Sequence, residues 1–374
     1  FPSSIRLHLL TSLAALLLSV RSTGSLSVGA DHARPLRIGV VGGGASGMFA
    51  GACAAAALGA RPSATVTVLE SSPGVLRKVL LSGGGRCNVL HDTTKPLSTI
   101  LGGYPRGEKE LRGTYARRFG PDDAKQWFET RGVALKTEAD GRMFPVTDDS
   151  STIADCIRRA AEEAGAGVRT GARVATVAAT ADDRGTRGPP FAVRFGGDDE
   201  VRTFDCLVLA TGSARAGHAL AGALGHAIVP PVPSLFTLDA RGAVAGGGEG
   251  LLAGLAGVSV KNAEVALRLS VPGKKKKRAV AQRGPLLVTH TGLSGPAALR
   301  LSAFAAREFH ALGYNATVSV HWAPHAGTWE EVFEVLWRQT SRSPKRGVGT
   351  ACPLVPGVDD AGASPIPRRL WARL

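Results

Sequence analysis

LRIGVVGGGASGMFAG, residues 36–51, predicts the fold of this chain. LRIGVV is a continuous apolar run with β-branched residues, typical of a strand buried on both faces. An Ala-rich segment follows the glycines, and Gly59 and Pro62 end its helical pattern. ATVTVLE, residues 64–70, is the next strand, so the whole is a strand–turn–helix–strand unit of βαβ size. The fold class predicted from this unit is α/β with a Rossmann-like nucleotide-binding domain.

The glycine pattern Gly42-x-Gly44-x-x-Gly47 lies directly after the first strand and opens the helix. That context is typical of a dinucleotide-binding turn. The first glycine makes the turn, the second lets a pyrophosphate approach the backbone, and the third lets helix and strand pack closely. The helix N-terminus, with Ala45 and Ser46, offers N–H groups to the phosphates. The alternative is an ordinary glycine turn of an α/β domain.

Glu70 ends the second strand, where a carboxylate accepts hydrogen bonds from a ribose diol and repels a 2′-phosphate. The site is therefore expected to prefer the ADP half of FAD or NAD over NADP. FAD is favoured over NAD by the turn Ala210-Thr211-Gly212, which follows the strand CLVLA. A second glycine cluster, LSGGGRCN over residues 81–88, also favours FAD.

The domain pattern changes at Pro230, Pro231 and Pro233. Beyond them come short strand-like pieces separated by glycine turns, namely SLFTLDA, LAGVSV, AEVALRLS, GPLLVTH and ATVSVHW. We predict a FAD-binding domain over residues 35–231 and a mostly β domain over residues 232–374. The basic run KKKKR, residues 274–278, is interpreted as a solvated hairpin tip rather than a nuclear or nucleic-acid signal.

The composition limits the classes of partner. The 374 residues are 44% hydrophobic and carry a net charge of +15, which suits a nucleic acid, an acidic membrane surface or an acidic ligand. Aromatic residues make up only 5%, and arginines are scattered rather than clustered, so a small-molecule substrate is expected and no nucleic acid. The five cysteines form no CxxC pair, which argues against a disulfide framework or a metal site.

Residues 1–34 have the features of a targeting segment. Arg6 precedes the apolar run LHLLTSLAALLLSV, and no acidic residue occurs before Asp31. The run is too short to span a bilayer comfortably, so no stable transmembrane span is predicted. We expect a secretory signal or a presequence for a plastid or mitochondrion. The alternative is an N-terminal amphipathic helix.

Six motifs occur in one order along residues 36–302: GVVGGGASGMFAG, VLESSPGVLRKVLLSGGGRCNV, DGRMFPVTDDSSTIAD, DCLVLATG, LGHAIVPPVPSLFTL and THTGLSGPAALRLS. In these motifs the chain resembles the BaiN/aminoacetone-oxidase-like (YhiN-type) family of FAD-dependent oxidoreductases. The resemblance implies a Rossmann-like FAD domain interrupted by an inserted β-rich domain. It also implies a non-covalent FAD that transfers hydride or electrons between a small substrate, or transiently bound NAD(P)H, and an acceptor.

The resemblance gives the second glycine cluster a role. Its bare backbone would pass close to the flavin, whose charge the N–H groups of residues such as Gly84 and Gly85 could stabilise. Arg86 would add a cation, and Asn88 can donate and accept. Cys87 beside Arg86 would have a lowered pKa and serve as a redox thiol. The alternative for Cys87 is a small packed residue near the cofactor.

His290, in THTGLSGP, is a candidate general acid, with a structural histidine as the alternative. The predicted catalytic residues are thus Arg86, Cys87 and His290. The predicted cofactor-binding set is completed by three further residues, Lys78, Ser82 and Val174.

The C-terminal part departs from the family pattern. The family returns to its FAD domain through a glycine-rich segment that closes over the flavin, and nothing similar follows Leu312. The chain is therefore expected to be truncated and to hold less than one equivalent of FAD. Two further functions stay open: a non-catalytic nucleotide-binding remnant without the flavin lid, and a basic RNA-modifying flavoprotein.

Overall fold

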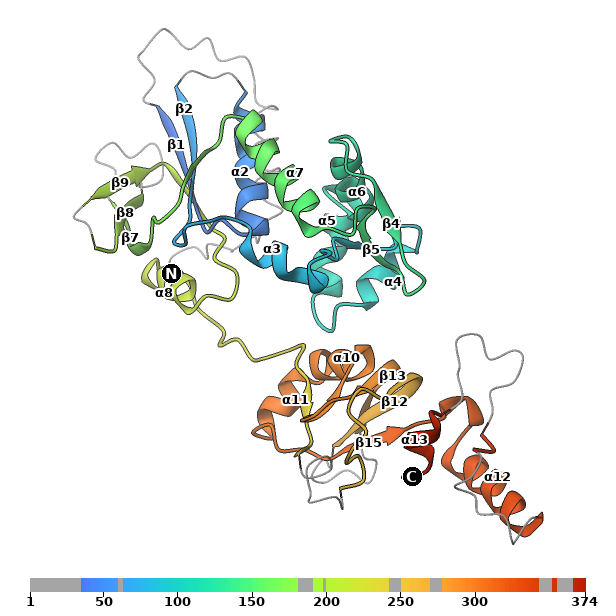
Figure 1. Cartoon of the computed structure of the whole chain (residues 1–374). Helices are drawn as coiled ribbons and strands as arrows, with labels where there is room; N and C mark the ends of the chain where they lie inside the picture. The colour runs from blue at the N-terminus through green and yellow to red at the C-terminus, as the bar shows by residue number, and fades with distance from the viewer. Residues whose placement is uncertain are drawn as a thin grey trace. The chain divides into compact units, whose positions relative to one another are not determined.

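The computed structural model describes residues 35–59, 63–180, 191–197, 200–241, 250–269, 278–342, 352–354 and 366–374. The predicted targeting segment and the lysines of the KKKKR run lie outside these residues. Contacts within the chain divide it into two units, Phe1–Val229 and Pro230–Leu374 (Figure 1). This division falls two residues before the domain boundary predicted from the proline cluster.

A parallel sheet forms the centre of the first unit, with the strand order β10-β1-β2-β6. Its strands are β10 (Cys206–Leu209), β1 (Leu36–Val41), β2 (Ala64–Leu69) and β6 (Gly167–Arg169). Val40 and Val68 are fully buried, as the apolar runs of β1 and β2 predict for a sheet covered on its faces. The α/β class predicted from sequence is confirmed.

Two helices of the first unit pack side by side, α2 (Ala45–Leu58) and α7 (Ser150–Glu163) (Figure 1). The small residues of α2 allow close approach to the sheet, and a Cβ on Gly51 would lie 2.7 Å from Val68 Cγ2. The N-cap of α7 is Asp149, whose carboxylate accepts the backbone N–H of Ser151 at 2.8 Å. This cap satisfies one of the free N–H groups at the start of the helix.

Two small antiparallel sheets complete the first unit. One has the order β3-β5-β4, with β3 (Leu90–His91), β5 (Arg142–Pro145) and β4 (Leu135–Thr137). The other has the order β7-β8-β9, with β7 (Val174–Ala179), β8 (Phe191–Phe195) and β9 (Val201–Phe204). The remaining helices are α3 (Arg77–Leu81), η1 (Ser82–Gly84), α4 (Leu97–Gly102), α5 (Glu108–Arg117), α6 (Pro121–Glu129) and α8 (Arg215–Ala223).

The second unit is built on an antiparallel sheet of order β11-β14-β13-β12-β15. The strands are β11 (Leu238–Asp239), β14 (Gly292–Ser294), β13 (Arg278–Val288), β12 (Ser259–Leu269) and β15 (Val318–His321). The helical segments are α10 (Pro296–Phe304), α11 (Ala306–Ala311), η2 (Pro324–Ala326), α12 (Trp329–Arg342) and α13 (Arg368–Trp371). This antiparallel sheet confirms the predicted mostly β second domain. Helix α10 packs against its strands β13 and β12.

One detail of this sheet differs from the sequence prediction. LAGVSV and AEVALRLS were expected to contribute separate strands, whereas both contribute to the single strand β12. The pairing of β12 with β13 shifts register between Val260 and Ala263. A β-bulge therefore absorbs the two polar residues that the sequence suggests as a break.

No helix within the described residues combines the length and the apolar character that crossing a bilayer requires.

Candidate functional site

The carboxyl ends of three parallel strands bring the predicted cofactor residues of the first unit together. Gly42 follows β1 and donates its N–H to the Leu69 carbonyl of β2 at 2.8 Å. Ala210 follows β10 and donates its N–H to the Val41 carbonyl at 2.8 Å. The glycine turn, Glu70 and the Ala210-Thr211 turn are therefore neighbours at one edge of the sheet, where ligands of open α/β sheets bind.

Gly42 and Gly47 are required by the fold itself. Gly42 has φ +108°, and a Cβ there would lie 2.5 Å from the Ala210 carbonyl oxygen. A Cβ on Gly47 would lie 1.7 Å from the Gly42 carbonyl oxygen, so the helix could not start this close to the turn. These are the turn and close-packing roles predicted for the first and third glycines.

Gly44 is different, because neither packing nor backbone conformation requires a glycine there. Its φ is −78°, which any residue adopts, and a Cβ would meet nothing within 4 Å. Gly44 is also the N-cap of α2, without a side-chain cap and without an acidic residue in the first turn of the helix. The site at Gly44 thus offers open space beside a helix N-terminus, which suits a phosphate.

Glu70 ends β2 with its carboxylate turned to the glycine turn. Its Oε2 accepts the N–H of Gly43 at 2.7 Å, and its Oε1 accepts the N–H of Ser72 at 2.8 Å. Partial burial raises the pKa of Glu70, but the hydrogen bonds from Ser72 and Gly43 outweigh this and lower the pKa overall. A carboxylate has about four lone-pair sites, so this ionised group can still accept ribose hydroxyls.

A short helix connects the glycine turn to the second glycine cluster. The N–H of Leu76, just before α3, donates to the Gly43 carbonyl at 2.8 Å, and α3 ends where the cluster begins at Ser82. Five helical residues span about 7.5 Å. Residues 82–88, called the bend below, are therefore held about one and a half helical turns from the glycine turn, at the end of α3 (Figure 1).

The bend has an unusual backbone. Four of its residues have left-handed φ angles, Gly83 (+58°), Gly84 (+70°), Gly85 (+85°) and Cys87 (+57°). A Cβ on Gly84 or Gly85 would meet nothing within 4 Å, so these two glycines serve conformation and leave open space. That bare backbone here faces a ligand stays a prediction.

Ser150 anchors the bend to the first turn of α7. Its N–H donates to the Gly85 carbonyl at 2.8 Å, and its hydroxyl donates to the Leu80 carbonyl at 2.7 Å. Only 4% of Ser150 is exposed. Ser150 lies within the motif DGRMFPVTDDSSTIAD, whose sequence gives no sign of these contacts.

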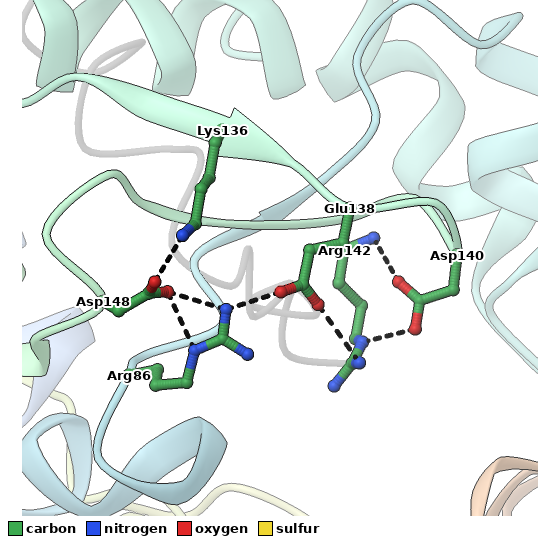
Figure 2. A network of polar contacts seen from close by, with 6 residues as sticks. All are labelled: Arg86, Lys136, Glu138, Asp140, Arg142 and Asp148. Atoms are coloured by element: carbon green, nitrogen blue, oxygen red, sulfur yellow. Dashed lines mark hydrogen bonds and ion pairs between the residues drawn. The ribbon is translucent and has the colours of Figure 1, made fainter.

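Arg86 lies between two carboxylates (Figure 2). Its Nη2 donates to Glu138 at 2.5 Å and to Asp148 at 2.7 Å, and Nε donates to Asp148 at 2.9 Å. The guanidinium also stacks on Phe144, 4.1 Å from the ring centroid. The bare cation expected beside the flavin is thus paired within the unit.

The pairs continue outward into a network of six charged side chains (Figure 2). Asp148 also accepts from Lys136, and hydrogen bonds from Lys136 and Arg86 lower the pKa of Asp148. Three cations and three anions make up this acid–base network: Arg86, Lys136, Arg142, Glu138, Asp140 and Asp148. The network is formally neutral.

Cys87 is buried, with 6% of its surface exposed. Burial raises the pKa of its thiol, and the Ser82 hydrogen bond that lowers it is the smaller effect. The lowered pKa expected from its neighbour Arg86 is therefore wrong, because Arg86 is turned to Glu138 and Asp148. This environment fits the packed-residue alternative.

The other predicted residues lie at several places. His290 is exposed between β13 and β14 in the second unit, while Arg86 and Cys87 belong to the first. Lys78 and Asn88 are exposed near the bend, and the Ser82 hydroxyl donates to the Val79 carbonyl at 2.8 Å. The last three predicted positions are buried Val174 at the start of β7, half-buried Thr211 and exposed Gly212.

Glu138, Asp148 and Lys136 were missed as partners of the bend. Glu138 and Asp148 lie 52 and 62 positions from Arg86, so no local pattern in the sequence signals these contacts. Among the described residues, no three His, Cys, Asp or Glu side chains gather as metal ligands do.

Comparison with known proteins identifies relatives of limited coverage. A 3-dehydro-bile acid delta(4,6)-reductase of Clostridium scindens is 27% identical over 55% of this chain and 48% of its own length. A ribosomal RNA dihydrouridine synthase of Escherichia coli is 28% identical over 71% of this chain and 60% of its own length. The chain thus spans about half to three fifths of the lengths of these relatives.

A solved structure, the 3-ketosteroid-delta4-(5alpha)-dehydrogenase of Rhodococcus jostii RHA1, matches with a TM-score of 0.34 and 18% identity, over 49% of this chain and 47% of the other. The family model described as "HI0933-like protein Rossmann domain" matches residues 36–320, which is most of the chain and includes the glycine turn and the bend. The chain therefore belongs to the HI0933-like family of Rossmann-domain proteins.

Proposed function

We propose that the first unit binds FAD non-covalently and that the protein is a flavin-dependent oxidoreductase. Its substrate would be a small molecule, or NAD(P)H visiting transiently, with electrons passed to a separate acceptor. The proposal is supported by membership of the HI0933-like family and by the arrangement of the glycine turn, Glu70 and the bend. When bound, FAD would supply the two-electron chemistry.

The residues of this unit have distinct parts in the proposal. The amide groups at the start of α2 would hold the diphosphate, and Glu70 would accept the ribose hydroxyls. The backbone of the bend would lie along the redox-active end. The N–H groups of Gly85 and Cys87 already donate to the Ser82 carbonyl, so the donation predicted for Gly85 is not part of the proposal. The buried thiol of Cys87 would pack near this end without ionising.

The open space and ordinary φ angle at Gly44 are the observation that supports the proposal most directly. The fold requires glycine at positions 42 and 47, whereas position 44 is an N-cap that would also accept Ser, Thr, Asn or Asp and gives no reason for glycine in particular. Close approach of a pyrophosphate supplies that reason.

Substitution of these glycines tests the assignment. Gly44→Ala is expected to lower the melting temperature of the apo-protein only slightly, because alanine fits the φ angle but is a poorer N-cap than glycine. It should weaken FAD binding about tenfold, measured by quenching of flavin fluorescence. Gly47→Ala is the matched comparison and should lower the stability itself by about 1–3 kcal/mol through overpacking. Wild-type FAD affinity in Gly44→Ala would count against the diphosphate site.

An enzyme and a non-catalytic remnant would differ in whether the bound flavin is reduced and reoxidised. An oxidoreductase shows flavin absorbance that NADH, NADPH or a substrate bleaches and an acceptor such as oxygen restores. A nucleotide-binding remnant would bind FAD or ADP without this cycle. Anaerobic titration followed by admission of air separates the two.

We propose reduction of a uracil base in RNA as a second candidate function. The ribosomal RNA dihydrouridine synthases of E. coli and Haemophilus influenzae support it, as does the net charge of +15. This candidate runs against the expectation that the chain has no nucleic-acid partner. Affinity for a ribosomal RNA fragment should fall at least about tenfold between about 50 and 200 mM salt if phosphate contacts carry binding. Absence of binding at low salt would remove this candidate.

We also propose that residues 1–34 direct the protein to an organelle or to the secretory pathway. The apolar run after Arg6 and the absence of acidic residues before Asp31 support this. Fusion of residues 1–34 to a fluorescent protein tests it, and a diffuse cytosolic signal would contradict it.

A further inference from the structure

We propose that Glu138 and Asp148 are positioning residues that clamp Arg86 and thereby fix the shape of the bend for the flavin. The inference rests on the proposed function, since it names what holds the flavin-facing backbone. It assigns a role to the β4–β5 hairpin, where no cofactor residue was predicted.

The clamp joins segments that are distant in sequence. Glu138 follows β4 and Asp148 follows β5, and they lie 52 and 62 positions from Arg86. Two nitrogens of Arg86, Nε and Nη2, make three hydrogen bonds to these acids. A guanidinium held at two nitrogens has a defined plane, which a single ion pair does not provide.

Two glycines of the bend need such an anchor because they have little side-chain packing around them. Gly84 and Gly85 have no neighbours that a Cβ would touch, and glycine has the greatest backbone freedom. Cys87 carries a Cβ in the left-handed region, which is unfavourable for residues other than glycine. Arg86 lies between these residues, so its side chain is placed to restrain both.

Phe144 adds a rigid support beneath the clamp. It is fully buried, its ring lies under the Arg86 guanidinium, and its Cε1 is 3.2 Å from where a Cβ on Gly83 would lie. The next strand of the chain is tied to the same hairpin, because the Val89 N–H donates to the Met143 carbonyl at 2.9 Å. The hairpin therefore contacts Arg86 in the middle of the bend and Val89 directly after it, and Phe144 leaves little room for a side chain at Gly83.

The ion pairs of the clamp should affect the position of Arg86 more than the free energy of unfolding. The side chains of Arg86, Glu138 and Asp148 are 34%, 31% and 42% exposed, and ion pairs with this exposure contribute little to unfolding free energy. Loss of the clamp should therefore change the bend and its ligand while the melting temperature changes little.

The test uses the double variant Glu138→Gln/Asp148→Asn in the full-length protein. Asp140→Asn is the control, because Asp140 belongs to the same hairpin and contacts Arg142 but not Arg86. We expect the double variant to bind FAD about tenfold more weakly, because the amides keep the shape of both acids but lose the charge that holds the guanidinium. The reduction potential of the bound flavin in the double variant should differ from wild type by more than it does in the Asp140→Asn control.

Arg86→Lys provides a second variant, which keeps the charge but cannot bridge both acids. It should behave as the double variant does, whereas a requirement for charge alone would leave it like wild type. Wild-type affinity and potential in both variants would overturn the clamp.

Amide hydrogen exchange of residues 81–89 in the apo-protein separates the two proposals. Faster exchange in the double variant than in Asp140→Asn supports the clamp, and equal exchange overturns it. A wild-type protein that binds no FAD would contradict the proposed function and not the clamp, which this exchange measurement still decides.

Discussion

Two arginines determine the ionisation of Glu200. Arg169 Nη2 lies 2.7 Å from one carboxylate oxygen and Arg202 Nε lies 2.5 Å from the other. The hydrogen bonds from Arg169 and then Arg202 lower the pKa of Glu200 to about 2. Because these contacts favour the ionised carboxylate, protonation of Glu200 at low pH costs free energy in the folded chain.

The stabilisation from Glu200 should therefore depend on pH. It is fully present above the ordinary glutamate pKa of 4.5 and is lost as the pH falls towards about 2. The melting temperature of Glu200→Gln should be lower than wild type at pH 7, and the difference should shrink below pH 4.5. Thermal melts across this range measure it.

Glu129→Gln serves as the control for this series. Glu129 has a single exposed ion pair of 3.9 Å with Lys125, so its substitution should change little. A Glu200→Gln difference that is constant from pH 7 to pH 3 would argue against the pairing.

At the scale of elements, α7 connects the core to the bend. Its buried face, including Ile153 and Ile157, packs in the cluster that also contains Met48 of α2. Its N-terminus carries both the Asp149 cap and the Ser150 contacts to the bend. The start of this helix is therefore part of the site.

Removal of the cap is expected to loosen this start. Asp149→Ala should destabilise the protein by about 1 kcal/mol, because the Ser151 N–H loses its acceptor. Denaturant unfolding measures the loss. Asp155→Ala removes an exposed acid from the same helix and should cost only a few tenths of a kcal/mol. Equal effects of the two would show that the cap does not matter.

The elements that sequence predicts best are those with a local cause. β1 and β2 follow from apolar runs, and the roles of Gly42 and Gly47 follow from a glycine spacing with a known geometry. The clamp could not be predicted, because nothing in the sequence says which acids reach Arg86 across more than fifty positions. The pKa of Cys87 was mispredicted for a related reason, since burial depends on the fold and not on the adjacent residue.

At the scale of the whole chain, each unit has its own core, and one helix of the second unit leaves large aromatic side chains exposed. In α12, Val332 is buried while Trp329 is 72%, Phe333 55% and Trp337 65% exposed. Phe333 and Trp337 stack at 6.2 Å between ring centroids. Three aromatic side chains in one exposed row are unusual for a protein surface.

Tryptophan fluorescence should report this row directly. We expect a large part of the emission to be quenched by acrylamide, because Trp329 and Trp337 are two of the five tryptophans. Trp329→Phe/Trp337→Phe should remove most of the quenchable signal. Strong shielding of both in the wild-type protein would mean that this face of α12 is covered in solution.

The short helix α3 has a consequence for how the chain tolerates change in length. It begins at a hydrogen bond to the glycine turn and ends at the bend, with five residues between them. One inserted or deleted residue would rotate everything after it by about 100° and shift it by about 1.5 Å. Substitutions on the exposed side of α3 can be absorbed, but an insertion or deletion would swing the bend away from any dinucleotide that the turn still held.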